Sequence, residues 1–148
     1  MSKQKLQHMN QSQVATLLSE VYSGVFMMPR AVTLEIKEDS PRATSQITLD
    51  GDNPFFKWHK HVFPGVMLIE FTQQLGFVIA KEVLGIKGLP FMFQVRNVLF
   101  HLPVEQDDTI IATTSLRERK RHFLFFDSEI RDLNGNLIMN ASFCGAGK

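Results

Sequence analysis

The spacing of apolar residues in the first third of the chain predicts one helix and two strands. After Ser12, a residue suited to cap a helix, apolar side chains recur at helical spacing as Val14, Leu17, Leu18 and Val21. Residues 31–36 and 42–49 instead alternate apolar and polar side chains, which is typical of half-buried strands. We therefore expect an amphipathic helix over residues 12–22, followed by two antiparallel strands.

A longer helix is predicted from about residue 64 to residue 84. Pro64 suits its first position, because the N–H that proline lacks would have no helical partner there. Apolar residues occur on nearly every side of this helix: Ile69, Phe77, Val78, Ile79, Val83 and Leu84. Such a helix is expected where a sheet encloses it.

Three strand candidates follow at residues 91–102, 109–118 and 123–132, and Asn134-Gly135 is a two-residue hairpin signal into a last strand at 137–143. One long helix followed by a run of antiparallel strands is an α+β arrangement. We expect a single domain over residues 1–148, in which a curled antiparallel sheet wraps a long central helix. Because such a sheet leaves its edge strands open, we also expect a homodimer or a larger homo-oligomer.

Composition fits one ordinary domain and narrows its partners. Of 148 residues, 44% are hydrophobic and 21% are charged, and the net charge of +1 gives no broad basic field for nucleic acid. Cys144 is the only cysteine, so neither an internal disulfide nor a cysteine-based zinc site can form, and no metal or cofactor is expected. Polar residues interrupt the apolar stretch at 62–84, which argues against a membrane span, and the first residues lack a secretory pattern. We expect a cytoplasmic protein.

The candidate chemistry lies between residues 53 and 70. Pro64-Gly65 opens the long helix, whose first N–H groups have no helical partners, and Glu70 places a carboxylate on an otherwise apolar element. His59 and His61 precede this helix start. Glu70 could act as a general acid, or could lie at an exposed edge or pair with a lysine; the histidines could be catalytic or ordinary loop residues.

This segment resembles the hot-dog-fold β-hydroxyacyl-acyl-carrier-protein dehydratases of fatty acid synthesis. The matching pieces are Phe55-Phe56 with His59 three positions later, the run from Phe63-Pro64-Gly65-Val66 to Glu70, and then Gln73 or Gln74. A weaker likeness follows at residues 95–104, with Asp107-Asp108. The resemblance extends from about residue 26 to residue 141 and implies the hot-dog fold.

In that family a histidine and a glutamate are catalytic, and the glycine that opens the helix offers its N–H to the thioester carbonyl. Carried over, these roles fall on His59, Glu70 and Gly65, and the substrate-binding set becomes Gly65, Val66, Phe63 and Gln74. The resemblance implies dehydration of a 3-hydroxyacyl thioester, carried by acyl carrier protein or coenzyme A, to the 2-enoyl thioester. It also implies that the two catalytic side chains come from different subunits.

The sequence departs from the family in the catalytic loop, where Lys60-His61-Val62 replaces a segment three residues longer. His61 therefore remains an alternative to His59. A hot-dog thioesterase, with Glu70 activating water, and a non-catalytic acyl-binding module are alternative functions.

Two further features could belong to the function. Residues 117–122 form a basic cluster that is either a solvated hairpin tip or a dock for an acidic carrier or coenzyme A phosphates. Several residues could line an acyl tunnel: Phe71, Phe77, Phe91, Met92 and Phe93.

Overall fold

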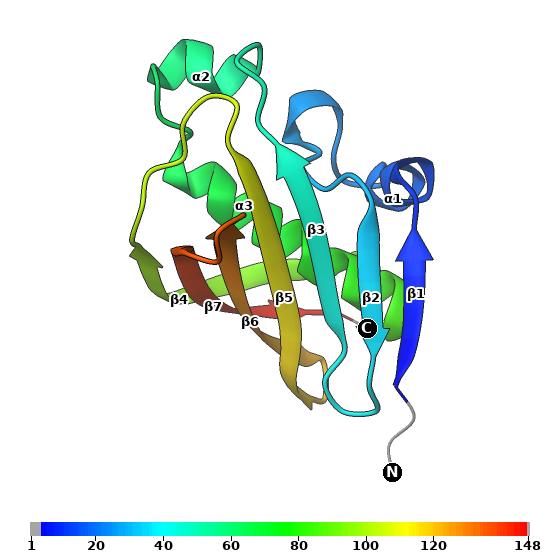
Figure 1. The fold of residues 1–148 in the computed structure, drawn as a ribbon. Coiled ribbons are helices and arrows are strands. Elements are labelled where there is room, and N and C mark those ends of the chain that lie inside the picture. The colour runs from blue at the N-terminus through cyan, green and yellow to red at the C-terminus, as the bar shows by residue number, and fades with distance from the viewer. Residues whose placement is uncertain (1–3, 148) are drawn as a thin grey trace.

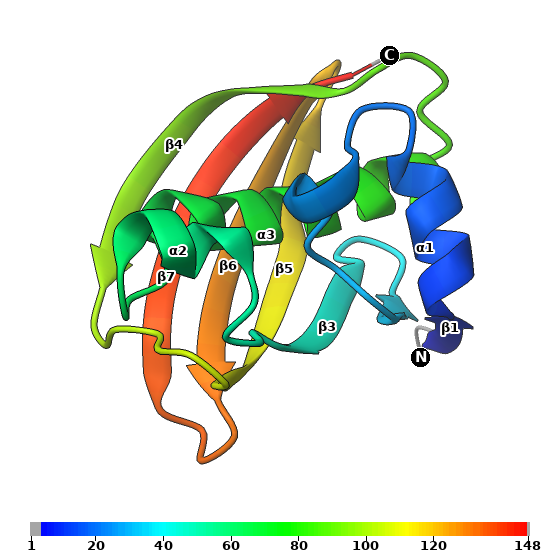
Figure 2. The same cartoon turned by 90° about the horizontal axis from the view of Figure 1, so that it is seen from above.

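A computed structural model describes residues 4–147 and shows one antiparallel sheet curled around a central helix (Figures 1 and 2). The elements, in chain order, are β1 (Lys5–Met9), α1 (Gln11–Leu18), η1 (Gly24–Phe26), β2 (Val32–Ile36), β3 (Arg42–Thr48), α2 (Pro54–His59), α3 (Gly65–Val78), η2 (Ile79–Val83), β4 (Phe91–Phe100), β5 (Thr109–Lys120), β6 (Phe123–Asp132) and β7 (Leu137–Ala146). The seven strands lie in the order β1-β2-β3-β5-β6-β7-β4. The predicted architecture of a long helix wrapped by an antiparallel sheet is confirmed.

Helix α3 is buried along most of its length because the sheet curls over it. Its inward side chains join one hydrophobic core, in which Phe71 and Leu75 have no exposed surface. The helix continues into η2 as a π-helical turn, where the Leu84 N–H donates to the Ile79 carbonyl five residues earlier. Lys81 of this turn donates from Nζ to three carbonyls of the following loop, at residues 86–88. No helix within residues 4–147 is long and apolar enough to cross a membrane.

The first helix differs from its prediction at both ends. Its N-cap is Asn10 and not Ser12, because the Asn10 side chain accepts the Gln13 N–H at 2.9 Å and the Gln13 side chain accepts the Asn10 N–H at 2.8 Å. The helix ends at Leu18, four residues before the predicted end, and the Tyr22 N–H then donates back to the Leu18 carbonyl.

Other boundaries shift by a few residues. Pro64 is the N-cap of α3 and not its first helical residue. The Asn134-Gly135 hairpin has a longer loop than the predicted two-residue one, because Asp132 binds the N–H groups of Asn134 and Asn136 through its carboxylate. Strand β1 and helix α2 were not predicted from the sequence.

Strand β4 forms one edge of the sheet and pairs only with β7. None of its ten residues is buried, and Phe91, Phe93 and Phe100 are all at least half exposed. Figure 2 shows this strand at the rim of the curled sheet, beyond α3. An apolar edge strand of this length is a ready surface for another strand.

Candidate active site

Three aromatic rings anchor the short helix that carries His59. The N-cap Asn53 accepts the Phe55 N–H at 3.0 Å, and Pro54 occupies the first helical turn. Phe55 and Phe56 are buried and pack edge-on against Phe63, with ring centroids 5.7 and 5.5 Å apart. The apolar half of α2 is thus fixed in the core, while His59 at its last position stays exposed.

The His59 ring is oriented by a backbone carbonyl. Its Nδ1 lies 2.8 Å from the Val62 carbonyl oxygen. Because a carbonyl can only accept, Nδ1 carries the hydrogen, and in the neutral ring Nε2 is then free to take a proton. This is the arrangement that a general base requires.

The shortened loop, residues 60–62, forms a strained turn that directs the Val62 carbonyl oxygen toward His59. Lys60 and His61 both have positive φ, 41° and 51°. The Val62 N–H donates to the Lys60 carbonyl, which closes a γ-turn around His61. Two side-chain-bearing residues in this region cost about 1–3 kcal/mol each. The Phe63 N–H bond to the Val104 carbonyl, at 2.8 Å, holds the far end of the loop in place.

A cavity of about 510 Å³ lies between His59 and the start of α3. Its walls include Phe63, Gly65 and Val66, together with residues 100–104, the end of β4 and the segment after it. A Cβ at Gly65 would lie 2.9 Å from the Phe100 ring, so a larger residue there would require the exposed Phe100 side chain to shift. As the first residue of α3, Gly65 has an N–H without a helical acceptor. His61 is exposed and does not line the cavity.

Glu70 lies on another side of α3, in a half-buried setting. Its carboxylate accepts from Gln74 Nε2 at 3.2 Å, and it forms no ion pair within residues 4–147. Gln74 is fully buried, and its Oε1 accepts the Met28 N–H at 2.8 Å. Burial, then the charge of Glu70 and a hydrogen bond with its carboxylate, raise the pKa of Tyr22. Glu70 is therefore held by polar groups of the core and not by a lysine.

The predicted site residues thus fall into two groups within one chain. His59, Phe63, Gly65 and Val66 share the 510 Å³ cavity, which Glu70 does not line. Gln74, predicted to bind substrate, is buried and forms hydrogen bonds with Glu70 and with the backbone of Phe26 and Met28. Sequence reasoning missed the Val62 carbonyl.

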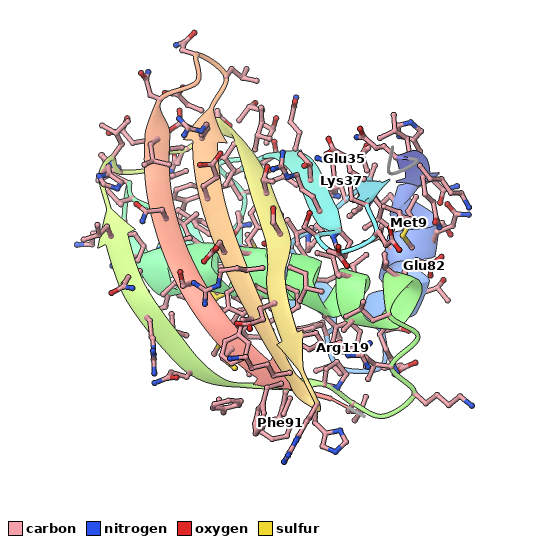
Figure 3. All side chains as sticks on the ribbon, turned by 90° about the horizontal axis from the view of Figure 1, so that it is seen from below. Met9, Glu35, Lys37, Glu82, Phe91 and Arg119 are labelled. Atoms are coloured by element: carbon pink, nitrogen blue, oxygen red, sulfur yellow. The ribbon has the colours of Figure 1, made fainter. Side chains whose placement is uncertain are left out.

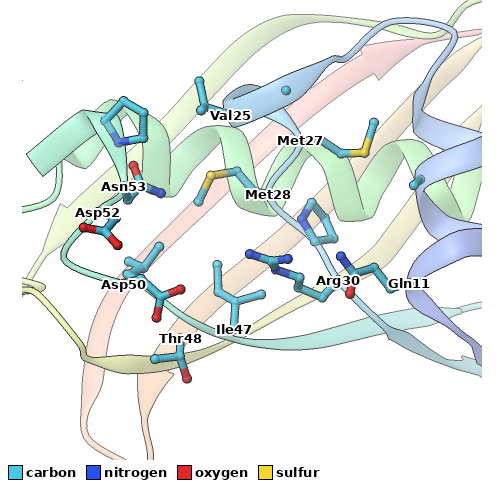
Figure 4. Close-up of a pocket in the computed structure, with 15 residues that line it drawn as sticks. Gln11, Val25, Met27, Met28, Arg30, Ile47, Thr48, Asp50, Asp52 and Asn53 are labelled. Carbon is cyan, nitrogen blue, oxygen red and sulfur yellow. The ribbon is translucent and has the colours of Figure 1, made fainter.

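Other cavities of the described residues include two that lie away from His59. One of about 260 Å³ is mainly apolar and borders Tyr22, Gly76 and Phe77, with Phe91 and Met92 opposite. Of the predicted tunnel residues, Phe71 and Phe93 do not line it. A second cavity has a volume of about 470 Å³, and neither His59 nor Glu70 borders it. Figure 4 shows Arg30, from the segment before β2, and Asp50, from the loop after β3, at this cavity.

Comparison with known proteins shows the family to which this chain belongs. No family model matches the chain. A 3-hydroxyacyl-[acyl-carrier-protein] dehydratase FabZ from Xanthomonas campestris is 27% identical over 142 residues, covering 92% of this chain and 90% of the relative. The corresponding FabZ from Xylella fastidiosa is 31% identical over 121 residues, covering 77% and 75%. This chain belongs to the FabZ dehydratase family. The family and the dehydratase class predicted from sequence are confirmed.

Solved structures place this FabZ-family chain in the hot-dog fold. The dehydratase heterocomplex ApeI:P from Xenorhabdus doucetiae superposes with a TM-score of 0.68 at 17% identity, covering 86% of each chain. A hypothetical thioesterase from Streptococcus pneumoniae, solved with coenzyme A, gives 0.58 at 16% identity, covering 75% of this chain and 80% of its own. The hot-dog prediction is confirmed, and the sheet is not closed into a barrel.

Proposed function

We propose that this protein converts 3-hydroxyacyl thioesters to 2-enoyl thioesters, with His59 as general base and Glu70 as general acid. The observation that carries the proposal is the bond from His59 Nδ1 to the Val62 carbonyl, because it leaves Nε2 free to act. Family membership supplies the reaction class.

The proposed step balances as an elimination of water. His59 Nε2 takes a proton from C2, the C2–H electron pair becomes the new C2–C3 bond, and the C3–O bond breaks. Glu70 gives its proton to the departing hydroxyl, which leaves as water. The Gly65 N–H at the start of α3 donates to the thioester carbonyl, where negative charge develops.

We assign the meeting of these groups to a dimer. His59 and Glu70 lie in separate surroundings within one chain, and the apolar edge β4 offers a strand for a second copy. A symmetric pair through β4 would bring His59 of one protomer to Glu70 of its partner.

The reaction class is tested with two substrates. Purified protein is mixed with a 3-hydroxyacyl thioester and, separately, with a saturated thioester of equal length. We expect enoyl absorbance from the first and no free thiol from either. Thiol release from the saturated compound would instead indicate a thioesterase, and no change with either would indicate a binding module.

The carrier in this proposal is an acidic acyl carrier protein. The β5–β6 hairpin carries Arg119 and Lys120, and its tip lies at the same end of the sheet as Phe91 (Figure 3). Phe93 packs against Phe123 there, with ring centroids 5.7 Å apart. A basic surface with apolar rings at its centre suits an acidic protein partner.

Reversing the charges of Arg119 and Lys120 to Glu should raise KM for the carrier-linked substrate by about tenfold and flatten its salt dependence. The measurement is KM at several salt concentrations, with Lys5→Glu on β1 as the matched control. A short thioester without carrier should show no change. An equal rise in KM with a coenzyme A thioester would indicate that the hairpin recognises phosphate and not the carrier.

A further inference from the structure

Phe100, the last residue of strand β4, lies against the glycine that opens helix α3. Its ring fills the space where a side chain at Gly65 would begin: a Cβ there would lie 2.9 Å from both Cε1 and Cζ of the ring, and 3.4 Å from Cε2. The far end of the ring therefore points at the Gly65 backbone. Because Cβ atoms on a helix are tilted toward its N-terminus, the ring lies at the end of α3 that has free N–H groups.

The backbone at Phe100 is fixed by the sheet. Phe100 pairs with the buried Met139 on β7, and the next N–H, that of His101, donates to the Ile138 carbonyl at 2.7 Å. Phe100 is 52% exposed, so its ring is a wall of the cavity and not part of the closed core. The strand thus determines where the side chain starts, and the ring extends from the sheet edge to the helix.

The same ring borders the cavity that holds the proposed base. Phe100, Gly65 and His59 all line the cavity of about 510 Å³. In the proposed reaction the thioester carbonyl accepts the Gly65 N–H, and C2, bonded to the carbonyl carbon, gives its proton to His59. A hydrogen bond places the carbonyl oxygen about 2.9 Å from the donor nitrogen, and C2 is only two bonds further. C2 and the Phe100 ring are therefore neighbours around one glycine.

We propose that Phe100 is a specificity-determining residue, whose ring restricts the dehydration to 3-hydroxyacyl thioesters that carry no branch at C2. The inference rests on the proposed function, in which Gly65 binds the carbonyl and His59 takes the C2 proton. An unbranched substrate has two hydrogens on C2, and one of them leaves in the reaction. In a 2-methyl substrate the other is replaced by a methyl group, which needs space beside Gly65 that the ring occupies. Fitting an extra methyl group into filled space forces the ring or the substrate to shift.

The test compares a 3-hydroxyacyl thioester with its 2-methyl analogue of equal chain length, both C2 epimers included. The analogue keeps one hydrogen on C2, so elimination of water remains possible. We expect the wild type to prefer the unbranched compound in kcat/KM by about 10- to 200-fold, the range for one methylene group in an apolar pocket. In Phe100→Ala this preference should fall by about tenfold or more, because the branched substrate gains space. The intrinsic effect of the methyl group on the reaction is the same for every variant, so a change in preference between variants reports fit.

Leu99→Ala is the matched control. Leu99 precedes Phe100 on the same strand and is exposed to a similar degree, at 55%, but it does not line the cavity. Its removal should leave the preference at the wild-type value, which separates the effect of the ring from that of trimming the sheet edge. Phe100→Leu keeps an apolar side chain at this edge and should give an intermediate preference. It also carries the test if Phe100→Ala does not fold.

The outcomes separate this inference from the function on which it rests. A wild type that accepts both compounds equally would overturn the role of Phe100. So would an unchanged preference in Phe100→Ala and Phe100→Leu, or an equal relaxation in Leu99→Ala. In each of these cases, enoyl formation from the unbranched compound would still support the proposed function. Wild-type protein that forms no enoyl product from either compound would overturn the proposed function itself.

Discussion

Replacing His59 by Ala is expected to lower kcat for dehydration by about 10² to 10⁴-fold, the usual value of a positioned acid or base. The ring that is removed is the one whose Nδ1 binds the Val62 carbonyl and whose Nε2 is free. The measurement is the steady-state rate of enoyl formation. The oligomeric state, followed by sedimentation, should not change, because the proposed dimer forms through strand β4 and not through His59.

His61 supplies the matched control for this loss. His61→Asn removes the second imidazole while keeping a residue type that tolerates the positive φ of 51° at this position. Its activity should remain within a few-fold of wild type, because the γ-turn depends on the backbone. The opposite outcome, a silent His59→Ala with an inactive His61→Asn, would show that His61 is the base.

Replacing Glu70 by Gln should abolish measurable dehydration while leaving the assembly intact. The amide keeps the shape of the side chain and can still contact Gln74, but it has no acidic proton to give to the departing hydroxyl. The measurement is enoyl formation, with thermal melting as the check on folding. Full activity would place the acid elsewhere.

Mixing the two inactive variants tests whether the site spans two protomers. If His59 of one protomer works with Glu70 of the other, a mixed dimer has one intact site out of two. Random reassociation should then restore about a quarter of wild-type activity. If both groups act within one protomer, every site in the mixture lacks one of them and no activity returns.

Most of the fold could be predicted because the spacing of apolar residues along the chain indicates which face of each helix or strand is buried. The helix around residues 65–83 and the strands β2 to β7 appear as apolar patterns in the sequence. Helix α2 has six residues, too few for a helical period to show, and β1 buries only Met9. Their places depend on packing and on strand pairing that no local pattern records.

The candidate site could be predicted only where it consists of side-chain groups and not of backbone groups. His59, Gly65 and Glu70 could be proposed as site residues because their residue types stand in an unusual order. The Val62 carbonyl was not found, since every residue has one and only the γ-turn aims this one at His59.

The π-helical turn η2 lies between helix α3 and the loop that leads to β4, so the rotation of the helix and the path of the loop need not change together. In a regular α-helix, one added residue rotates everything beyond it by about 100°, whereas a π turn holds the extra residue locally. Residues Gly65–Val78 can therefore keep a fixed rotation against the sheet, while Lys81 and its three carbonyl partners set the path toward β4. The rotation of Glu70 on α3 is therefore set independently of the segment that leads to β4.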